Sequence, residues 1–330
     1  MVFFTREQIE RELNMQDCIP AMEEAFRLLH DGPSFHVLRK RIHLPGGVTG
    51  WGNLFSLMPC YYDEHYFGAK VFSVFPDNSA GQLPTHQGLV MLFDSQTGTL
   101  LATADAHAIT EIRTAATSAL ATRLLSREDS SWACFIGAGT QARSHLDSIM
   151  AVRDIKKITI CNRSLPRAER FAKEIYNKYN IGAIICDSVH SAAYGADIIC
   201  TATTSGTPVI NLVDVAPGTH INAIGACAPC FRELSTDLVQ AASFFGDCRE
   251  AILNEPGDFL IPLEEGVISE DHLAGDLSQI VCGEVGRRTR EEITIFKSVG
   301  IGNEDVAALK LLYERYRHTD SHEYIELSGV

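Results

Sequence analysis

The chain has 330 residues, long enough for two domains, and its 45% hydrophobic and 21% charged residues are typical of a globular protein. Its formal net charge is −14, and an acidic surface repels phosphate backbones, so nucleic acid is not an expected partner. Its apolar runs are far shorter than the roughly 20 residues that cross a bilayer, so no membrane partner is expected either.

The first third of the chain combines helices with short strands, which indicates an α+β domain. Apolar residues at helical spacing predict a helix over residues 17–30. Asp94–Thr99 (DSQTGT) is typical of a hairpin loop, and a stretch rich in Ala, Leu and Thr predicts a long helix over 107–126. The predicted strands are 36–44, 51–59, 67–75, 89–93 and 100–105.

The middle of the chain alternates short apolar strands with helices, which is typical of βαβ units and a parallel sheet. The predicted strands are 132–136, 157–161, 182–186, 197–201 and 220–225, and the predicted helices are 140–151, 166–179 and 188–195. A last amphipathic helix is predicted over 303–317, with Asn303 as its N-cap. We therefore predict an α/β protein in which a Rossmann domain (114–297) is inserted into an α+β domain (1–113 plus 298–330).

The first strand of the middle region leads into a dinucleotide-binding fingerprint, Gly-x-Gly-x-x-Ala. Its residues are Gly137, Ala138, Gly139, Thr140, Gln141 and Ala142. The first glycine allows a tight turn, the second lets the backbone approach a pyrophosphate, and the small alanine lets the helix pack closely on the strand. The free N–H groups and the dipole of the helix N-terminus would favour the phosphates. Because the motif follows a strand and opens a helix, a cofactor site is favoured over an unrelated glycine turn.

The second strand of this region ends in residues that favour NADP(H) over NAD(H). An NAD site usually has Asp or Glu here, which binds the ribose 2′-hydroxyl. This chain has instead Asn162, Arg163, Ser164 and, further on, Arg167. Arg163 can bind a 2′-phosphate with its planar fork, the alternative being a solvated surface arginine. Thr203 and Gly225 follow the fourth and fifth strands and are predicted to lie where the cofactor crosses the sheet edge.

Three basic residues in apolar or small surroundings predict a pocket for a carboxylate. Lys70 lies in the strand-like FGAKVFSVF, so it must be paired or have a lowered pKa. Arg113 lies on the long helix, and Arg41 lies in RKRIHLP. None of the three has an acidic residue directly beside it in the sequence, and arginine binds carboxylates through two hydrogen bonds. Structural ion pairing is the alternative for each residue taken alone.

Six segments in this order resemble the ornithine cyclodeaminase/μ-crystallin family, which also includes archaeal-type alanine dehydrogenase. They are GAKVFSVFPDN, LPTHQGLVMLFD, ITEIRTAATSALATRLL, IGAGTQA, INAIGA-x-x-P-x-x-REL and TIFKSVGIGNED. The resemblance runs nearly end to end and implies a Rossmann domain inserted in a dimerising domain, with substrate held between the two. It also implies that Arg41, Lys70 and Arg113 bind the substrate carboxylate. His86 and the segment Lys297-Ser298-Val299-Gly300 are implied to lie near the nicotinamide.

Two positions depart from the ornithine cyclodeaminases of that family. Those enzymes have Glu before LMP and a catalytic Asp after the fifth strand, whereas this chain has Ser56 and Cys227. A thiol is a poor replacement for a carboxylate in the proton transfer that cyclodeamination needs. Those enzymes also recycle bound NAD, while Asn162-Arg163-Ser164 favours NADP(H). The differences point to the ketimine-reductase side of the family, represented by μ-crystallin.

We therefore expect an NADPH-dependent imine reductase of amino-acid metabolism, which converts a ketimine carboxylate to an α-amino acid. Arg41 and Arg113 would hold the carboxylate, and Lys70 would act as general acid or electrostatic support. His86 would orient the substrate or relay a proton, the alternative being a purely structural histidine. Met58 and Cys227 are expected to line the substrate site.

Two other functions are compatible with these residues. One is cyclodeamination or an alanine-dehydrogenase-like oxidation, and turnover without added cofactor would identify a cyclodeaminase. The other is a binding protein in which NADPH shapes a pocket for a hydrophobic carboxylate. Lys70 and Arg113 fit any of these roles.

The ten cysteines favour a reducing compartment, because many lie in apolar strand-like runs and the N-terminus does not resemble a signal peptide. A cytoplasmic protein is therefore expected. The CxxC pair of Cys227 and Cys230 has no second pair to match it, so no metal site is expected. The expected partners are a small imine or amino acid and, from the family resemblance, a second copy of the chain in a homodimer.

Overall fold

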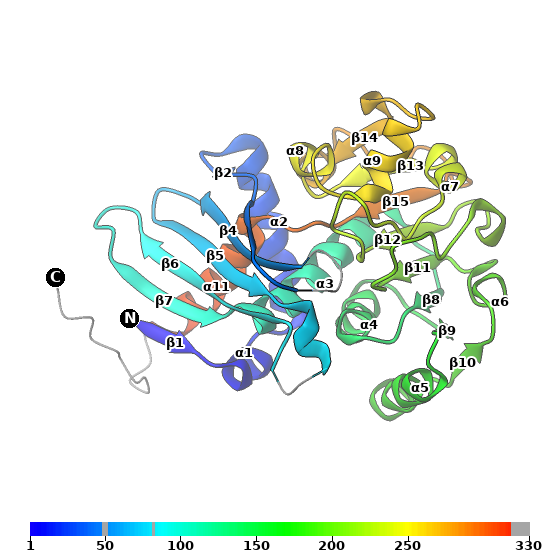
Figure 1. Ribbon diagram of the computed structural model, residues 1–330, viewed down its shortest axis with the longest axis horizontal. Helices are drawn as coiled ribbons and strands as arrows, with labels where there is room; N and C mark the ends of the chain where they lie inside the picture. The colour runs from blue at the N-terminus through cyan, green and yellow to red at the C-terminus, as the bar shows by residue number, and fades with distance from the viewer. Residues whose placement is uncertain (48–51, 81–82, 318–330) are drawn as a thin grey trace. The chain divides into compact units, whose positions relative to one another are not determined.

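The computed structural model describes residues 1–47, 52–80 and 83–317. The chain forms two compact units (Figure 1). Unit 1 comprises Met1–Thr114 and Gly300–Val330, and unit 2 comprises Ala115–Val299. The sequence-based boundaries lie at 113/114 and 297/298. The long helix α3 (Ala106–Leu125) contains the first division between the units.

Unit 1 is built on a mixed sheet of seven strands, counted over the described residues, in the order β1-β7-β6-β5-β4-β2 with β3 paired to β4. The β1–β7 pair is parallel and the other pairs are antiparallel. The strands are β1 (Val2–Phe4), β2 (Phe35–His36), β3 (Lys40–Leu44), β4 (Asn53–Tyr61), β5 (Tyr66–Val74), β6 (His86–Asp94) and β7 (Leu100–Asp105). Asp94 stabilises the β6–β7 turn because its Oδ1 accepts the N–H groups of Gln96 and Thr97.

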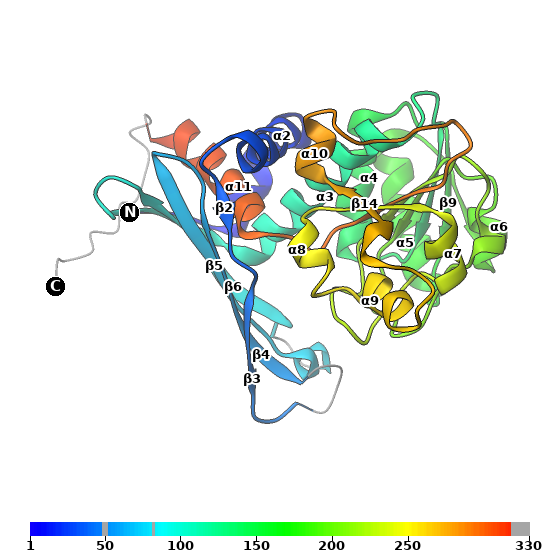
Figure 2. The ribbon, with the colours of Figure 1, turned by 90° about the horizontal axis from the view of Figure 1, so that it is seen from above.

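Helix α11 (Gly302–Tyr316) packs on one face of this sheet, against β4, β5 and β6, and α2 (Met15–Asp31) packs against α11 (Figure 2). A short helix α1 (Arg6–Glu12) precedes α2, and η1 (Pro76–Ala80) follows β5. The prediction that Asn303 caps the last helix is wrong, because the helix begins at Gly302 and Ile301 is its N-cap. The Asn303 amide is instead buried and donates to Ser34 Oγ at 2.8 Å, which connects α11 to the segment before β2.

Unit 2 contains an all-parallel sheet in the order β10-β9-β8-β11-β12-β15-β13-β14. Its strands are β8 (Trp132–Ile136), β9 (Lys157–Cys161), β10 (Ala183–Cys186), β11 (Ile198–Thr201), β12 (His220–Ala223), β13 (Ser243–Gly246), β14 (Leu273–Asp276) and β15 (Thr294–Lys297). Successive strands β8, β9 and β10 run outward in one direction, and β11 and β12 run in the other. The direction of strand order therefore reverses between β8 and β11, which is the switch point of a doubly wound fold.

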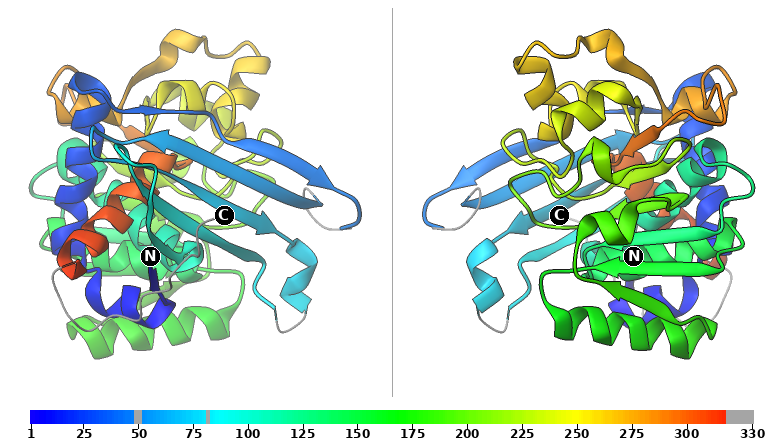
Figure 3. Two further views of the ribbon diagram at one scale, coloured as in Figure 1. Left: turned by 90° about the vertical axis from the view of Figure 1, so that its left-hand side faces the viewer. Right: turned by 90° about the vertical axis from the view of Figure 1, so that its right-hand side faces the viewer.

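The helices of unit 2 connect these parallel strands. They are α4 (Thr140–Val152), α5 (Leu165–Tyr179), α6 (Val189–Ala193), α7 (Thr236–Ala241), α8 (Arg249–Ile252), α9 (Gly257–Glu264) and α10 (Leu277–Val281), with η2 (Leu212–Asp214) and η3 (Glu270–His272). The long green helix α5 in Figure 3 packs beside β9 and β10. Phe171 of α5 meets Phe135 of β8 edge to face at 5.6 Å, and both side chains are buried. Strands that are covered on both faces in this way have nearly continuous apolar sequences.

The predicted fold class is confirmed, and the predicted strands 132–136 and 157–161 coincide with β8 and β9. The predicted strand 36–44 is instead two strands, β2 and β3, and the residue predicted to begin the next strand, Trp51, lies outside the described residues. Strands β13, β14 and β15 were not predicted. Each has four residues, as do the predicted strands β10, β11 and β12, so length alone does not explain why they were missed.

Candidate active site

The predicted cofactor residues of unit 2 all follow the carboxyl ends of parallel strands. Gly137 follows β8, and Asn162 follows β9. Beyond the switch point, Thr203, Gly225 and Ser298 follow β11, β12 and β15. Because the strands are parallel, these residues lie along one edge of the sheet, the edge where doubly wound folds bind ligands. We call it the cofactor edge.

The glycine-rich turn at this edge has the geometry that a pyrophosphate requires. Gly137 has φ 113°, and a Cβ there would lie 2.5 Å from the carbonyl oxygen of Ala202. Gly139 is exposed, and a Cβ on it would meet nothing within 4 Å, so the space beside it is open. Helix α4 begins at the next residue, Thr140, and Ala142 is fully buried against the sheet. These residues fit the phosphates of a dinucleotide.

Arg143, which the sequence analysis did not single out, braces this turn. Its Nη1 donates to the carbonyl oxygen of Ala138 at 2.7 Å and to that of Gly139 at 3.1 Å. Its Nε pairs with Glu174 at 2.5 Å. Its position four residues after Gly139 on a helix was the signal that could have identified it. The side chain of Gln141, in contrast, has a buried Oε1 with no hydrogen-bond partner among the described residues.

At the end of β9 the basic residues are available for a ligand. Asn162 Nδ2 donates to the carbonyl oxygen of Ser164 at 2.8 Å, which shapes the turn into α5. The side chains of Arg163 and Arg167 are exposed, and neither pairs with an acid among the described residues. No carboxylate follows the strand directly to repel a 2′-phosphate. This arrangement fits a phosphorylated ribose.

Lys297 and Cys227 lie close together beyond the switch point. Lys297 is fully buried and pairs with Asp258 at 2.8 Å. Burial alone would lower the pKa of Lys297, but the attraction of Asp258, with smaller contributions from Cys227 and Glu233, raises it. The Cys227 thiol donates to the carbonyl oxygens of Ile224 and Ser298 at 3.5 and 3.6 Å.

The segment after β15 is held by a second buried acid. The N–H of Val299 donates to Asp247 Oδ2 at 2.7 Å. Ser298 is also buried, and its Oγ has no hydrogen-bond partner among the described residues. A buried hydroxyl without a partner is available to a ligand.

In unit 1, two of the three predicted cations meet two acids of α11. Lys70 Nζ pairs with Asp305 Oδ2 at 2.9 Å, and Arg113 Nε donates to Asp305 Oδ1 at 2.8 Å. Arg113 Nη1 also pairs with Glu304 at 2.6 Å. All four side chains are buried. The ion pairing that the sequence analysis kept as the alternative is therefore present for Lys70 and Arg113, because the fold brings acids to them from about 190 residues or more along the chain.

Arg113 nevertheless keeps part of its guanidinium available. Its Nε and Nη1 bind the two acids, while Nη2 makes no hydrogen bond to any described residue. A Cβ on Gly300 would lie 2.7 Å from Nη2, so a glycine there leaves this edge of the guanidinium uncovered. Burial would lower the pKa of Arg113, but Asp305 and Glu304 raise it, and the group stays charged. It can therefore still bind a carboxylate.

The environment of Lys70 lowers the pKa of its ammonium group. Burial lowers its pKa to about 8, and the positive charges of Arg113 and Arg39 add to this, while Asp305 opposes it. Its ammonium also donates to Thr110 Oγ1 at 3.2 Å and lies 5.2 Å from the centre of the Phe72 ring. A lysine with this pKa can give a proton to a substrate and recover it from solvent.

Strand pairing places the other predicted residues of unit 1 on the same face of the sheet as Lys70. Met58 lies directly opposite Lys70, and Arg41 lies opposite Ser56, two residues further along β4. Met58 and Ser56 are buried, and Ser56 Oγ has no partner among the described residues. Arg39, which the sequence analysis did not select, precedes β3 and affects the pKa of Lys70, so its charge lies near that ammonium.

His86 lies on this face too, but further from Lys70. It pairs with Val74, whereas Lys70 pairs with Val90, so the two pairs are separated by four residues, or roughly 13 Å along the strand. Its Nδ1 lies 3.0 Å from Thr85 Oγ1, and the side chain is exposed. His86 is therefore at the rim of the cluster around Lys70.

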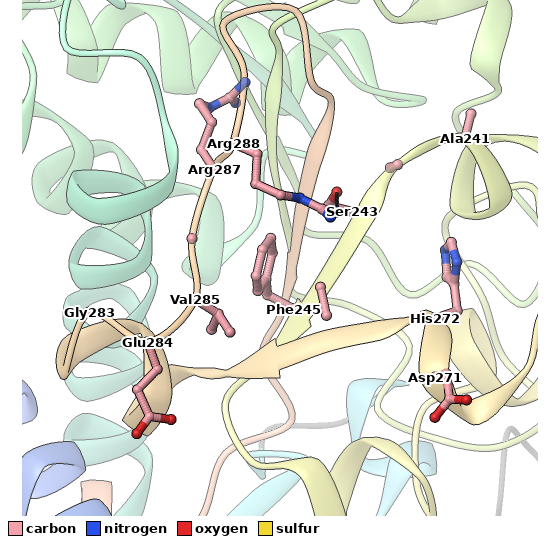
Figure 4. Close-up of a pocket in the computed structure, with 13 residues that line it drawn as sticks. Ala241, Ser243, Phe245, Asp271, His272, Gly283, Glu284, Val285, Arg287 and Arg288 are labelled. Carbon is pink, nitrogen blue, oxygen red and sulfur yellow. Dashed lines mark hydrogen bonds between the residues drawn. The ribbon is translucent and has the colours of Figure 1, made fainter.

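Unit 2 also has a cavity of about 710 Å³ (Figure 4). Phe245 and Val285 lie near its middle, and Arg288 reaches Ser243 from the loop before β15. Ser243 begins β13 and His272 directly precedes β14, so the cavity lies at the amino ends of these strands. The residues predicted to bind the dinucleotide lie at the opposite edge, and this cavity is not their site.

Comparison with known proteins identifies the family of this chain. Residues 1–320 match the model of the ornithine cyclodeaminase/mu-crystallin family. A Delta(1)-pyrroline-2-carboxylate reductase of Bacillus cereus is 39% identical over 261 residues, 78% of this chain and 80% of the relative. The ketimine reductase mu-crystallin of Mus musculus is 34% identical over 317 residues, 95% and 97% of the two chains.

A solved structure is also similar along almost its whole length. It is Delta(1)-pyrroline-2-carboxylate reductase of Thermococcus litoralis in complex with NADH and L-proline. The TM-score is 0.93 at 35% identity, with 98% of this chain and 100% of that chain covered. Among the described residues, no helix is long and apolar enough to cross a membrane. On the match of residues 1–320, this chain belongs to the ornithine cyclodeaminase/mu-crystallin family.

Proposed function

We propose that the protein is an NADPH-dependent ketimine reductase, which reduces the C=N bond of a small imine carboxylate to give an α-amino acid. The main observation behind this proposal is that Lys70 and Arg113 both bind the carboxylate of Asp305. This cluster combines an arginine edge left available for a carboxylate with a lysine whose pKa is lowered to about 8. Relatives named as reductases of pyrroline-2-carboxylate and of ketimines support the same reaction.

In this proposal the residues of unit 1 bind and protonate the substrate. Arg113, with Arg41 or the neighbouring Arg39, holds the carboxylate by charge-assisted hydrogen bonds. Lys70 keeps the imine nitrogen protonated, which makes the adjacent carbon a better hydride acceptor. Met58 forms an apolar wall, and His86 orients the substrate or relays a proton from the rim. Cys227 is proposed as a further contact of the substrate.

Unit 2 would hold the cofactor. The turn Gly137–Ala142 would bind the pyrophosphate, and Asn162, Arg163, Ser164 and Arg167 would bind the phosphorylated ribose. Thr203, Gly225 and the segment Ser298-Val299-Gly300 would contact the nicotinamide half. When bound, NADPH supplies the hydride. The choice of NADPH over NADH rests on the absent carboxylate after β9 and on the unpaired arginines there.

The test is to follow NADPH oxidation with the cyclic imines pyrroline-2-carboxylate and piperideine-2-carboxylate, in parallel with NADH. Rapid, NADPH-preferring oxidation with formation of proline or pipecolate is expected. Ammonia release from ornithine without imine reduction would instead identify a cyclodeaminase. Tight binding of a hydrophobic carboxylate with no turnover of either imine would identify a binding protein.

We further propose a cytoplasmic homodimer. No disulfide joins the ten cysteines, which fits a reducing compartment. The face of the unit 1 sheet opposite Lys70 exposes Ile42 and Phe55, which pair directly, and Leu89. Such an apolar patch is typical of a protein interface. Sedimentation of the wild type and of Phe55→Lys tests this, with a dimer that the substitution weakens as the expected result.

A further inference from the structure

The carboxylate of Glu233 is fully buried at the cofactor edge and binds two strand ends at once. Its Oε1 accepts the N–H of Thr203 at 2.7 Å, and its Oε2 accepts the N–H of Gly225 at 2.8 Å. Oε2 also accepts the hydroxyl of Thr201, the last residue of β11, at 2.8 Å. Since β11 and β12 pair in parallel, one side chain from a later loop fixes both segments that leave them.

Asp258 and Lys297, also fully buried, extend this network to a third strand. Asp258 Oδ1 accepts the backbone N–H of Glu233 at 2.7 Å, and its Oδ2 pairs with Lys297 at 2.8 Å. Lys297 ends β15 and donates to the carbonyl oxygen of Gly225. The ends of three consecutive strands, β11, β12 and β15, are thus joined by two carboxylates and one ammonium.

Gly225 packs closely against the carboxylate of Glu233. A Cβ on Gly225 would overlap the carbonyl oxygen of Thr203 and would lie 2.6 Å from Glu233 Cδ. The glycine is needed here for close approach, since its backbone packs directly on the carboxylate. Any change in the length or hydrogen bonding of this side chain must therefore move the segments at Thr203 and Gly225.

Stability alone is a weak reason for this arrangement. Burial raises the pKa of Glu233, because the ionised form loses its hydration, while Lys297 and the threonine contacts only partly offset that effect. Buried ionic clusters elsewhere have been replaced by apolar residues with neutral or stabilising effect. What an apolar residue cannot provide is a single acceptor that sets the spacing of two backbone N–H groups.

We infer that Glu233 is a positioning residue for the nicotinamide half of the cofactor. It acts through Thr203 and Gly225, which follow β11 and β12, the strands on the other side of the switch point from β8 and β9. The inference rests on the proposed use of a dinucleotide by unit 2. It predicts that Glu233 affects the nicotinamide end and leaves the adenosine end unchanged.

The experiment compares two ligands by calorimetry on the full-length Glu233→Gln variant. One is NADPH, and the other is 2′-phospho-ADP-ribose, which lacks the nicotinamide. The amide NH₂ would face a backbone N–H, so one hydrogen bond is lost and a repulsive contact replaces it. The expected result is a roughly tenfold weaker affinity for NADPH and an affinity for the fragment within about twofold of the wild type.

Stereochemistry gives a second readout that general destabilisation does not move. With NADPH deuterated on one face of C4, the wild type is expected to transfer hydride from a single face. Glu233→Gln is expected to transfer detectably from both faces, because a loosely held ring can rotate. Glu233→Asp, which keeps the charge but reaches less far, should behave similarly and serves if the amide variant does not fold.

The matched control is Asp214→Asn, since Asp214 is a buried carboxylate of the same unit that accepts the N–H of Asn211 at 2.9 Å beside η2. It should lower Tm without separating the two affinities. Equal weakening of NADPH and fragment in the Glu233 variants, or no weakening of either, would overturn the inference. These binding measurements need no substrate, so failure of the wild type to reduce imines would overturn the proposed function and leave this test intact.

Discussion

The buried acids of the two units bind different partners. In unit 1, Asp305 and Glu304 bind the side chains of Lys70 and Arg113, so charge compensates charge. In unit 2, Glu233 accepts two backbone N–H groups and a hydroxyl. The first arrangement tunes side chains that can change protonation or bind another anion. The second fixes backbone segments and leaves the chemistry to a bound ligand.

Substitutions near Asp305 in unit 1 and near Glu233 in unit 2 should therefore affect different kinetic parameters. Changes around Lys70 should act on the imine substrate and on the pH dependence of its reduction. Changes at the cofactor edge should act on the dinucleotide, whatever the substrate. A substitution in one unit that alters the parameters assigned to the other would break this division.

The largest effect is expected for Arg113→Lys, which keeps the positive charge but removes the guanidinium edge at Nη2. The affinity for the carboxylate depends on those N–H donors, so kcat/KM for the imine should fall about 100- to 1,000-fold, the loss of one or two charge-assisted hydrogen bonds. The KM for NADPH should stay within about twofold of the wild type. Steady-state kinetics with both ligands varied measures this.

Thermal melting is the control for Arg113→Lys. A lysine cannot make all the hydrogen bonds of Arg113 to Glu304 and Asp305, so the variant could also be less stable. A variant that melts near the wild type and reduces imines at an undiminished rate would remove Arg113 from the substrate site. An equal loss in the NADPH parameters would contradict the separation of the two units.

The second largest effect is expected for Arg163→Ala, at the end of β9. Loss of one charge-assisted hydrogen bond to the 2′-phosphate should raise the KM for NADPH about 10- to 100-fold. The KM for NADH should hardly change, because that cofactor has no phosphate for the arginine to bind. Kinetics with both cofactors gives the ratio, and Arg170→Ala, which removes an exposed arginine on the following helix α5, is the matched control.

If Arg163→Ala affects NADPH and NADH equally, the arginine does not select the phosphate. Preference for NADH in the wild type would contradict the cofactor assignment outright. In that case the absent carboxylate after β9 would not be sufficient to predict NADP(H).

These two sites also differ in how far sequence predicts them. The residues of the cofactor edge follow strand ends, and parallel strands bring all such ends to one edge, so Gly137, Asn162 and Thr203 could be grouped from topology alone. The pairing of Lys70 with Asp305 spans 235 residues, and Asp305 itself reads as a polar residue in the first turn of a helix. No periodicity connects the two.

The same reasoning explains why Glu233 and Arg39 were not selected. Glu233 lies in a loop after β12, and only the fold shows that its side chain returns to the ends of β11 and β12. The sequence does not distinguish Arg39 from Arg41. They are two residues apart in a strand-like run, so both side chains are expected on the same face. Only strand pairing distinguishes them, because β3 begins at Lys40 and places Arg41 opposite Ser56 rather than opposite Met58.

The pH dependence should follow Lys70. Its pKa is about 8, so the ammonium form is complete well below that pH and is lost as the pH rises through it. If the protonated lysine is required, kcat/KM for the imine should be level below about pH 7 and fall about tenfold per pH unit above 8. Rates from pH 6 to 10, with NADPH saturating, test this.

The imine substrate also loses a proton as the pH rises, in wild type and variants alike. A control is therefore needed to separate the titration of Lys70 from that of the imine. Thr110→Val removes a hydroxyl that accepts the Lys70 ammonium at 3.2 Å. Without that acceptor the charged form of Lys70 is less stable, so the pH at which kcat/KM begins to fall should be lower. If this pH does not change, the fall in kcat/KM reports titration of the substrate instead.

The smallest effect is expected for His86→Gln. The imidazole lies at the rim, with its strand pair roughly 13 Å along the sheet from that of Lys70, so we expect it to act on the far end of the substrate or through water. We expect about a fivefold loss in kcat/KM, well below the 100-fold or more that direct proton transfer contributes. Stopped-flow measurement of hydride transfer separates this from slower product release. A 100-fold loss would place His86 in the chemistry and Lys70 in a purely electrostatic role, whereas an unchanged rate would leave its contact with Thr85 as its only function.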